Sequence, residues 1–299
     1  MTDNSLPAAR GGTLILVAVD GSASSYEAAA WAAVDAVLHG SPVHLLTSVA
    51  LVGGIGPAMS LPEAEMNWLR TDGERIVTEA ARIVREAARE TEVTVTTEVT
   101  FDLPIPTLIE RSKSVRTLVL GSRGLGAFQR GLLGSVSTAV TRHAHCPVAV
   151  IHDRAATDAV SVTKPILVGV DGSENSVPAV EYAFDEAARR KVDLVALHAW
   201  SDSSSIDFAT AEWESIRESE RALLAERLAG YAERYPEVTV RRIVVSDRPV
   251  RALLEASADA QLVVVGSHGR GGFAGMLLGS TNNALLHVVE CPMVVVRRR

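Results

Sequence analysis

Two glycine-rich segments contain the residues best suited to hold an anion. Each reads Gly-x-x-Gly, nine further residues, and then Gly-Ser at the start of a predicted helix. The two sets are Gly121, Gly124, Gly134 and Ser135, and Gly266, Gly269, Gly279 and Ser280. Glycine lets the backbone approach a ligand closely, and the free N–H groups at a helix start attract negative charge. The repeated spacing predicts two phosphate-binding loops; the alternative is a pair of loops that each end in a serine N-cap.

Further residues of these segments are candidates for contacts with phosphates. The GxxxxGK[ST] pattern is absent and neither segment contains a lysine, so positive charge would come from arginine or histidine. The candidates are Ser122, Arg123, Gly126 and Arg130 in the first segment, and Ser267, His268, Arg270 and Gly271 in the second. Val136-Ser137 in one copy becomes Thr281-Asn282 in the other, so the contacts at the helix ends are expected to differ slightly.

An aspartate follows the first apolar run of each half. Asp20 and Asp171 each open an Asp-Gly-Ser triplet, where a carboxylate could accept from ribose hydroxyls or help to hold a metal ion. The alternative is a turn in which the aspartate or the serine caps the next helix. Ala18 and Gly169 stand two residues earlier and are small enough for a ligand to pack against the strand end.

The second apolar run of each half ends where adenine could bind. Backbone groups at such strand ends commonly bind adenine, which makes Ser48 and Ala199 the contact positions. Asp202 lies where dinucleotide-binding folds keep a ribose-binding acid, whereas Leu51 occupies the matching place. The two pockets are therefore expected to differ.

The segments that must position these residues are repeated along the chain. LVAVDGS at 16–22 returns as LVGVDGS at 167–173. The repeat predicts one domain at 1–152 and a second at 165–299, joined by a polar linker at 153–164.

Within each half, strands are expected to alternate with helices. Apolar or alternating runs predict strands at 14–19, 43–50, 91–99, 115–120, 148–151 and 237–245, and helical patterns cover 22–39, 62–90, 136–144 and 281–290. This order predicts an α/β fold class, with two tandem Rossmann-like, doubly wound, five-stranded parallel sheets. In such sheets ligands bind beyond the carboxyl ends of the strands, at the point where the strand order reverses.

The last strand of each half lacks the charges and prolines that normally protect an exposed sheet edge. These strands are VAVI at 148–151 and MVVV at 293–296. We expect the two to pair and to form an intramolecular pseudo-dimer with pseudo-twofold symmetry; a homodimer is an open alternative.

The composition limits the classes of partner. A net charge of −7 argues against nucleic acid, which needs a basic surface. No apolar stretch approaches the ~20 residues of a membrane span, and the first twelve residues lack an apolar signal core, so we expect a cytoplasmic protein. His143, His145 and Cys146 have no matching ligand set in the second half, so no metal site is expected there. The sequence pattern indicates no catalytic Ser/His/Asp or Cys/His set, so no catalytic residue is assigned.

With the aspartate and the G-2x-G-9x-G[S/T] spacing both present twice, the sequence resembles the universal stress protein family in its tandem-domain form. The resemblance covers 13–152 and 165–297. It implies an adenine-nucleotide fold with strand order 3-2-1-4-5, a cytoplasmic location and a role in stress responses. It also implies that the candidate residues named above, together with Val136 in the first copy and Thr281 in the second, line two pockets, each of which binds ATP, with or without Mg²⁺. Some members of the family bind cyclic AMP through a similar pocket.

We favour a regulatory binding module whose bound ATP sets its conformation or its choice of protein partner. A slow ATPase or nucleotide-dependent transferase, and a purely structural tandem domain that has lost its ligand, are the alternatives. We further expect that a β-carbon at Gly121 or Gly266 would block the nucleotide while leaving the fold intact, because these strand ends are taken to be exposed.

Overall fold

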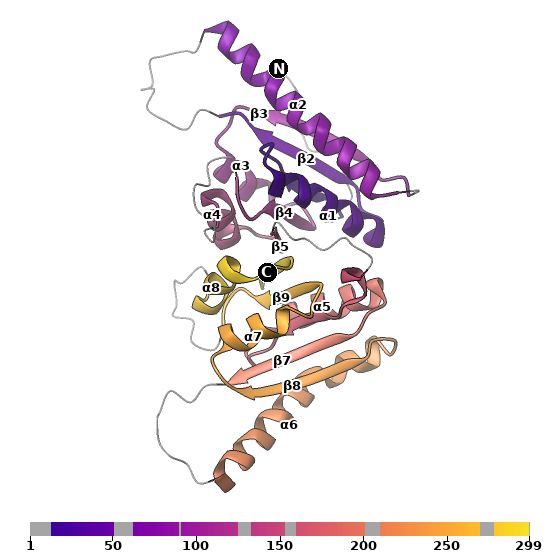
Figure 1. The fold of residues 1–299 in the computed structure, drawn as a ribbon, viewed down its shortest axis with the longest axis vertical. Helices are drawn as coiled ribbons and strands as arrows, with labels where there is room; N and C mark the ends of the chain where they lie inside the picture. The colour runs from indigo at the N-terminus through magenta and orange to yellow at the C-terminus, as the bar shows by residue number, and fades with distance from the viewer. Residues whose placement is uncertain are drawn as a thin grey trace. The chain divides into compact units, whose positions relative to one another are not determined.

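The chain forms two compact units, Met1–Asp153 and Arg154–Arg299. The computed structural model describes residues 13–50, 62–89, 91–124, 133–152, 160–200, 210–269 and 278–298. In both units strands and helices alternate along the chain, as Figure 1 shows.

The first unit contains a five-stranded parallel sheet. Its elements are β1 (Ile15–Ala18), α1 (Ala23–His39), β2 (Val43–Ser48), α2 (Glu63–Ala87), β3 (Val95–Thr100), α3 (Pro104–Arg111), β4 (Thr117–Gly121), α4 (Ser135–His143) and β5 (Val148–Ile151). The strands lie in the order β3-β2-β1-β4-β5, and every pair is parallel. The strand order therefore reverses at β1, which lies between β2 and β4.

The second unit repeats this arrangement. A short 3₁₀ helix, η1 (Ser161–Thr163), precedes β6 (Ile166–Gly169), α5 (Val177–Arg190), β7 (Leu194–Trp200), α6 (Thr210–Arg234), β8 (Val240–Ser246), α7 (Pro249–Ser257), β9 (Leu262–Gly266), α8 (Ser280–Val288) and β10 (Met293–Val296). Its strands lie in the order β8-β7-β6-β9-β10, again all parallel. The expected fold class and the 3-2-1-4-5 order are confirmed in both units.

The alternating strand of each unit begins later than expected. The strands predicted at 91–99 and 237–245 start at Val95 and Val240, because these residues pair with the first residues of the neighbouring strands, Val43 and Leu194. The residues before them have no partner strand to extend the ladder. The alternating pattern identified the strands correctly, but it could not show where the neighbouring strand begins and therefore where pairing starts.

Helices cover both faces of each sheet. In the first unit α1 packs beside α2 and α3 beside α4; in the second, α5 packs beside α6 and α7 beside α8 (Figure 1). The central strands are consequently buried on both faces, and Ile15, Leu16 and Val17 have no exposed surface. Such burial explains why these strands read as continuous apolar runs rather than alternating ones.

The first helix of each unit begins differently. α1 starts at Ala23, and Ser22 is its N-cap. α5 starts only at Val177, because Pro178 has no N–H to donate to the carbonyl of Glu174 and so prevents an earlier helical turn. The segment that follows the aspartate is therefore helical in one unit and a turn in the other.

The end of the predicted linker is bound to the second unit. Gln261 donates through Nε2 to the carbonyl oxygens of Val162 at 2.9 Å and of Lys164 at 2.5 Å. Lys164 Nζ in turn donates to the carbonyl of Ala258 at 3.0 Å. Residues 153–159 lie outside the described residues, so the predicted linker limits stay a prediction.

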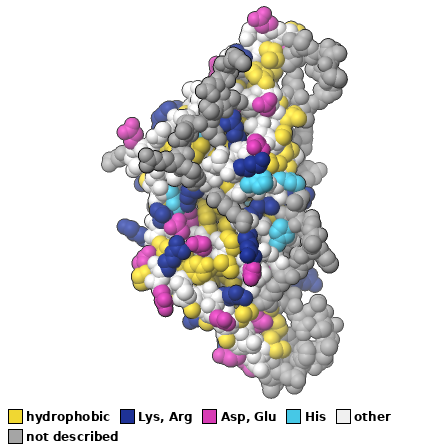
Figure 2. All heavy atoms as spheres, turned by 180° about the vertical axis from the view of Figure 1, so that it is seen from behind, with side chains coloured by type: hydrophobic (Ala, Val, Ile, Leu, Met, Phe, Trp, Pro, Cys, Tyr) yellow, Lys and Arg dark blue, Asp and Glu magenta, His cyan; other side chains and the backbone are white. Residues whose placement is uncertain are grey.

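The charged side chains of the surface are largely mixed in sign. Figure 2 shows positive and negative side chains interspersed on the face that it draws. On α2, for example, Arg82 forms ion pairs with Glu79 and Glu86. Within the described ranges, no helix combines the length and the apolar character that a membrane crossing requires.

Candidate functional site

The Asp-Gly-Ser triplets form tight turns at the carboxyl ends of β1 and β6. Asp20 Oδ1 accepts from the backbone N–H of Ser22 at 3.0 Å and from its hydroxyl at 2.6 Å. Asp171 Oδ1 accepts the equivalent bonds from Ser173 at 2.9 and 2.7 Å. Gly21 has φ +86°, which a side chain would rarely adopt. One oxygen of each aspartate thus stabilises the fold, as the alternative interpretation expected.

The second carboxylate oxygen of each aspartate faces the glycine loop. A β-carbon at Gly124 would lie 2.5 Å from Asp20 Oδ2, and one at Gly269 would lie 2.9 Å from Asp171 Oδ2. Asp171 Oδ2 is buried and has no hydrogen-bond partner among the residues that the structure describes. A buried carboxylate oxygen without a partner is costly, so this atom is suited to receive a donor from a ligand.

The glycine loop closes onto the strand from which it starts. The N–H of Gly134 donates to the carbonyl of Ser122 at 2.8 Å, and the N–H of Gly279 donates to that of Ser267 at 2.9 Å. Gly134 and Gly279 are the N-caps of α4 and α8, and no side chain caps either helix. The alternative of a serine N-cap is therefore wrong, since Ser135 is already the first helical residue.

Glycine at these N-caps is not explained by the fold. Gly134 has φ −62°, which any residue adopts, and the nearest atom to an added β-carbon would be 3.5 Å away. Serine, asparagine or aspartate would cap the helix better. Glycine leaves the first amides of α4, at Ser135 and Val136, open to an anion. In α8 the amides of Ser280 and Thr281 lie at the equivalent positions.

One of the two sequence differences between the helix starts, Ser137 against Asn282, lies inside the protein, whereas Val136 and Thr281 are half-buried. Ser137 Oγ donates to the carbonyl of Gly121 at 2.7 Å, and Asn282 Nδ2 donates to that of Gly266 at 2.5 Å. Both side chains are buried. Ser137 and Asn282 therefore make equivalent hydrogen bonds, and of the two differences only that between Val136 and Thr281 lies outside the core.

The expectation that Gly121 and Gly266 are exposed is wrong. Both are buried, because the first turn of α1 and the residues that lead into α5 cross directly over the strand ends. A β-carbon at Gly121 would lie 2.7 Å from the carbonyl carbon of Ser24, and one at Gly266 would lie 2.5 Å from the carbonyl oxygen of Asn175. Packing alone requires glycine here, so alanine would disturb the fold as well as any ligand.

Other predicted residues also have structural partners. Ser48 Oγ donates to the carbonyl of Asp102 at 2.7 Å, which uses its side chain in the turn before α3. A β-carbon at Gly169 would lie 3.3 Å from Leu253 Cδ1, so the packing of α7 accounts for a small residue at that position. Ala18 and Ala199 are half-buried at the ends of β1 and β7.

The cationic candidates are only partly described. Ser24 Oγ donates to the carbonyl of Arg123 at 2.5 Å, which ties the loop to α1. His268 Nδ1 lies 3.1 Å from Ser267 Oγ. The remaining candidates fall outside the described residues; they are Leu51, Gly126, Arg130, Asp202, Arg270 and Gly271.

One residue beside the second site was missed by sequence reasoning. His198 on β7 is 2% exposed, and its Nδ1 lies 2.6 Å from the carbonyl oxygen of Val170, the residue before Asp171. Its Nε2 lies 2.9 Å from Glu220 Oε2 on α6. The only signal in the sequence is a histidine within the apolar run LVALHAW.

The first unit has its own buried polar network, nearer the start of the strands. His44 Nδ1 lies 2.8 Å from Thr96 Oγ1, and its Nε2 lies 3.0 Å from Glu98 Oε2. Arg111 donates to Glu98 Oε1 at 2.9 Å. Burial lowers the pKa of His44 from its ordinary 6.5, although the hydrogen bond to Glu98 acts in the opposite direction.

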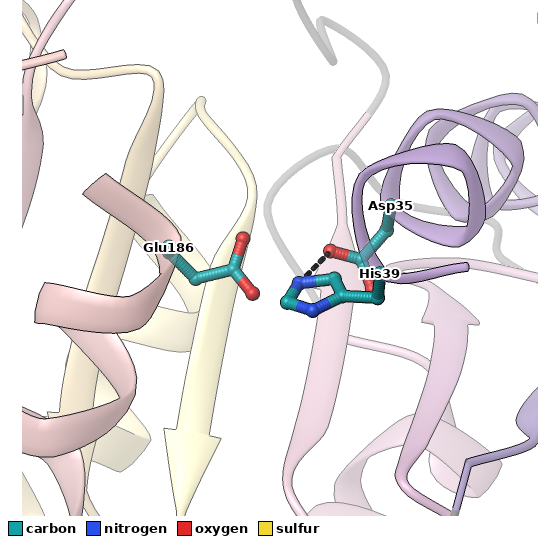
Figure 3. Close-up of side chains that lie close together, drawn as sticks. All are labelled: Asp35, His39 and Glu186. Atoms are coloured by element: carbon teal, nitrogen blue, oxygen red, sulfur yellow. Dashed lines mark ion pairs between the residues drawn. The ribbon is translucent and has the colours of Figure 1, made fainter. Parts of the chain in front are cut away.

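A further ionisable cluster lies near the amino ends of the strands of the first sheet, beside the end of α1 and the start of β4. Asp35 and His39 both come from α1, and His39 Nε2 lies 3.6 Å from Asp35 Oδ1 (Figure 3). Arg116, just before β4, donates to Asp35 Oδ2 at 3.1 Å and lies 2.9 Å from His39 Nε2. Because guanidinium only donates, His39 Nε2 accepts, and the arginine neutralises the aspartate. This cluster lies away from the candidate site.

Comparison with known proteins assigns both halves of the chain to one family. The model described as "Universal stress protein family" matches residues 13–152 and 163–297. A universal stress protein of Mycobacterium tuberculosis is 46% identical over 285 residues, which cover 95% of this chain and 97% of that protein. One of Mycolicibacterium smegmatis is 46% identical over 288 residues, again covering 95% of this chain and 97% of its own length.

The fold is shared with a solved structure as well. A universal stress protein from Archaeoglobus fulgidus has a TM-score of 0.68 at 21% identity, and the match covers 96% of this chain and 99% of that one. With the family model matched once in each half and relatives similar along nearly their whole length, the chain belongs to the universal stress protein family, in its tandem two-domain form.

Proposed function

We propose that each domain binds one ATP and that the protein acts as a nucleotide-dependent regulatory module in the stress response. The observation that supports this best is that a carboxylate oxygen and a helix N-terminus without a side-chain cap lie at the same glycine loop in each unit. The Oδ2 atom of Asp20 lies on one side of Gly124, and that of Asp171 lies on one side of Gly269. In the first unit the uncapped N-terminus of α4 lies close to Gly124, since a β-carbon at Gly134 would be 3.7 Å from the N atom of Gly124. In the second unit the uncapped N-terminus of α8 begins at Gly279, whose N–H donates to the carbonyl of Ser267.

These two groups differ in charge, which orients the ligand. A carboxylate repels phosphate but accepts hydrogen bonds from ribose hydroxyls, so the nucleoside end would lie against Asp20 or Asp171. The open amides of α4 and α8 favour an anion, so the phosphates would lie against them. A Mg²⁺ ion accompanying ATP would offset the negative charge of the phosphates near the carboxylate.

A regulatory role fits these groups better than rapid chemistry does. Hydrolysis of ATP needs a group that positions water and charges that stabilise the transferred phosphoryl group. In the described part of the site, each aspartate uses one oxygen in its turn, and apart from Arg123 and His268 the groups named above are backbone amides and small residues. We place the protein in the cytoplasm, where bound ATP would set its conformation or its choice of partner.

The test is to identify and count the bound nucleotide. Mass spectrometry of the ligand released from the denatured, purified protein is expected to show ATP; cyclic AMP would replace that assignment. Calorimetry on stripped protein is expected to give two sites per chain, and a stoichiometry of zero or one would reject the proposal. Sustained turnover near the enzyme median of ~10 s⁻¹ would reject the regulatory role.

A further inference from the structure

One buried hydroxyl links the aspartate turn of the first unit to its glycine loop. Ser24 is the second residue of α1, and its Oγ donates to the carbonyl of Arg123 at 2.5 Å. The same oxygen accepts from the backbone N–H of Arg123 at 3.3 Å. Ser24 is 3% exposed, and a β-carbon at Gly121 would lie 2.6 Å from its Oγ, so the start of the loop lies directly on it. One side chain therefore holds both polar groups of the Arg123 backbone.

Arg123 lies between the two groups that the proposed ligand would contact. On one side is the turn of Asp20, whose Oδ1 accepts from the hydroxyl of Ser22. On the other side is the N-cap of α4, since a β-carbon at Gly134 would lie 3.7 Å from Arg123 Cα. The backbone of Arg123 thus connects the turn that carries the carboxylate with the helix end that carries the open amides. Its position sets the distance between them.

Ser22 does not replace Ser24 in this contact. A hydroxyl group has a single proton to donate. Ser22 Oγ lies 2.6 Å from Asp20 Oδ1 but 3.3 Å from the carbonyl oxygen of Arg123, so its proton is directed to the carboxylate. Ser24 is therefore the principal donor to Arg123, and without it that carbonyl would keep only the longer contact.

The second unit has a different residue at this position. Asn175 stands where the first unit has Ser24, and His268 stands where it has Arg123. The carbonyl oxygen of Asn175 would lie 2.5 Å from a β-carbon at Gly266, so the backbone crosses the strand end as in the first unit. Within the described residues, however, no hydrogen bond joins the side chain of Asn175 to the glycine loop. The backbone crossing is thus shared, whereas the side-chain link belongs to the first unit.

We propose that Ser24 is a positioning residue of the first nucleotide site, which fixes the distance between the ribose-binding carboxylate of Asp20 and the phosphate-binding amides of α4. This inference rests on the proposed function. A ligand that contacts both groups binds best when they are already correctly spaced, since no affinity is then lost in ordering the loop. A ligand that contacts only one group gains little from the spacing. Ser24 is buried and acts through the backbone of Arg123.

The test compares a ligand that contacts both groups with one that contacts only the carboxylate. Binding of ATP and of adenosine is measured by calorimetry on stripped protein, in an Asp171→Asn background that allows the first site to be read alone. The Ser24→Ala substitution is expected to weaken ATP binding at the first site by roughly 3- to 10-fold, the equivalent of one neutral hydrogen bond. Adenosine has no phosphate, so its affinity is expected to stay the same.

Ser112→Ala is the matched control. Ser112 is 1% exposed, and its Oγ donates to the carbonyl of Ile109 at 2.6 Å and accepts from the N–H of His145 at 2.9 Å. Like Ser24 it holds two backbone groups, but it lies at the end of α3, which leads to the start of β4 and so to the opposite end of the strands. Both substitutions are expected to lower the urea midpoint, because each removes buried hydrogen bonds. Only Ser24→Ala is expected to weaken ATP binding.

Hydrogen exchange of the unsubstituted, stripped protein gives a measurement that needs no variant. The Arg123 amide donates to Ser24 Oγ, so it is expected to be protected before any nucleotide is added. Exchange of this amide at the rate of an unfolded chain would overturn the positioning role, because the loop would then not be held in advance.

The binding results separate this inference from the function on which it rests. ATP affinity that is unchanged in Ser24→Ala, or that falls by the same factor as the affinity for adenosine, would overturn the role of Ser24 while leaving ATP binding intact. An equal loss of ATP affinity in Ser112→Ala would also overturn it, since the loss would then follow from reduced stability. Unsubstituted protein that binds no ATP would overturn both the inference and the proposed function.

Discussion

Replacing Asp171 with asparagine should separate ligand binding from folding. The amide oxygen can keep the role of Oδ1, which accepts from the N–H and hydroxyl of Ser173 at 2.9 and 2.7 Å. The turn is therefore expected to survive. The substitution alters Oδ2 instead: this charged acceptor, which faces Gly269, becomes a neutral NH₂ group.

The expected changes in affinity and in stability depend on the surroundings of Asp171 Oδ2. A hydrogen bond to a charged group contributes about 1.5–3 kcal/mol, so the affinity of the second site should fall roughly 10- to 150-fold. Oδ2 of Asp171 is buried and has no hydrogen-bond partner among the described residues. Removing its charge should leave the free energy of unfolding unchanged or raise it by up to about 1 kcal/mol. Binding and stability are thus expected to change in opposite directions.

Calorimetry and urea denaturation of stripped protein measure the two quantities. Ser173→Ala is the matched control, because it removes one hydrogen bond from Oδ1 and leaves Oδ2 alone. It should cost about 1 kcal/mol of stability with little effect on affinity. Unchanged affinity in Asp171→Asn would show that Oδ2 does not receive a ligand donor. A marked loss of stability would show that the turn needs the charge.

Three further substitutions test the site and its surroundings. Gly121→Ala should cost about 1–3 kcal/mol in urea denaturation, since it overpacks against Ser24; a native midpoint would contradict this. Gly134→Ala should change the free energy of unfolding by about 1 kcal/mol or less, yet weaken nucleotide binding at the first site in calorimetry. Unchanged affinity would show that the phosphates do not bind at the N-terminus of α4. Because the pKa of His44 is lowered in the fold, wild-type stability should fall as pH drops below 6.5, and His44→Val, which copies Val195, should reduce that loss in acid denaturation.

Much of the fold could be predicted because it depends on local patterns. Apolar runs and turn residues located the strands and helices, and general rules for parallel sheets placed their carboxyl ends at one edge. The repeated spacing then identified the two glycine loops. Features set by the order of elements along the chain were therefore accessible from the sequence.

Contacts between distant segments were not accessible in this way. The burial of Gly121 depends on how α1 crosses β4, which no local pattern encodes. The equivalence of Ser137 and Asn282 becomes visible only when both are seen to donate to the same carbonyl. The pairing of His198 with Glu220 depends on how α6 packs against the strands, which no local pattern encodes either.

The divided use of each aspartate has a consequence for the evolution of tandem proteins of this kind. Selection for folding alone would retain Asp20 and Asp171, because one oxygen of each holds the turn. A domain that had ceased to bind nucleotide would therefore still display its Asp-Gly-Ser triplet. Folding does not require Gly134 and Gly279 in this way, since both positions have room for a side chain. Serine, asparagine or aspartate there would cap α4 and α8 better than glycine does. Substitution of Gly134 or Gly279 should therefore be the earliest sequence change in a domain that no longer binds nucleotide.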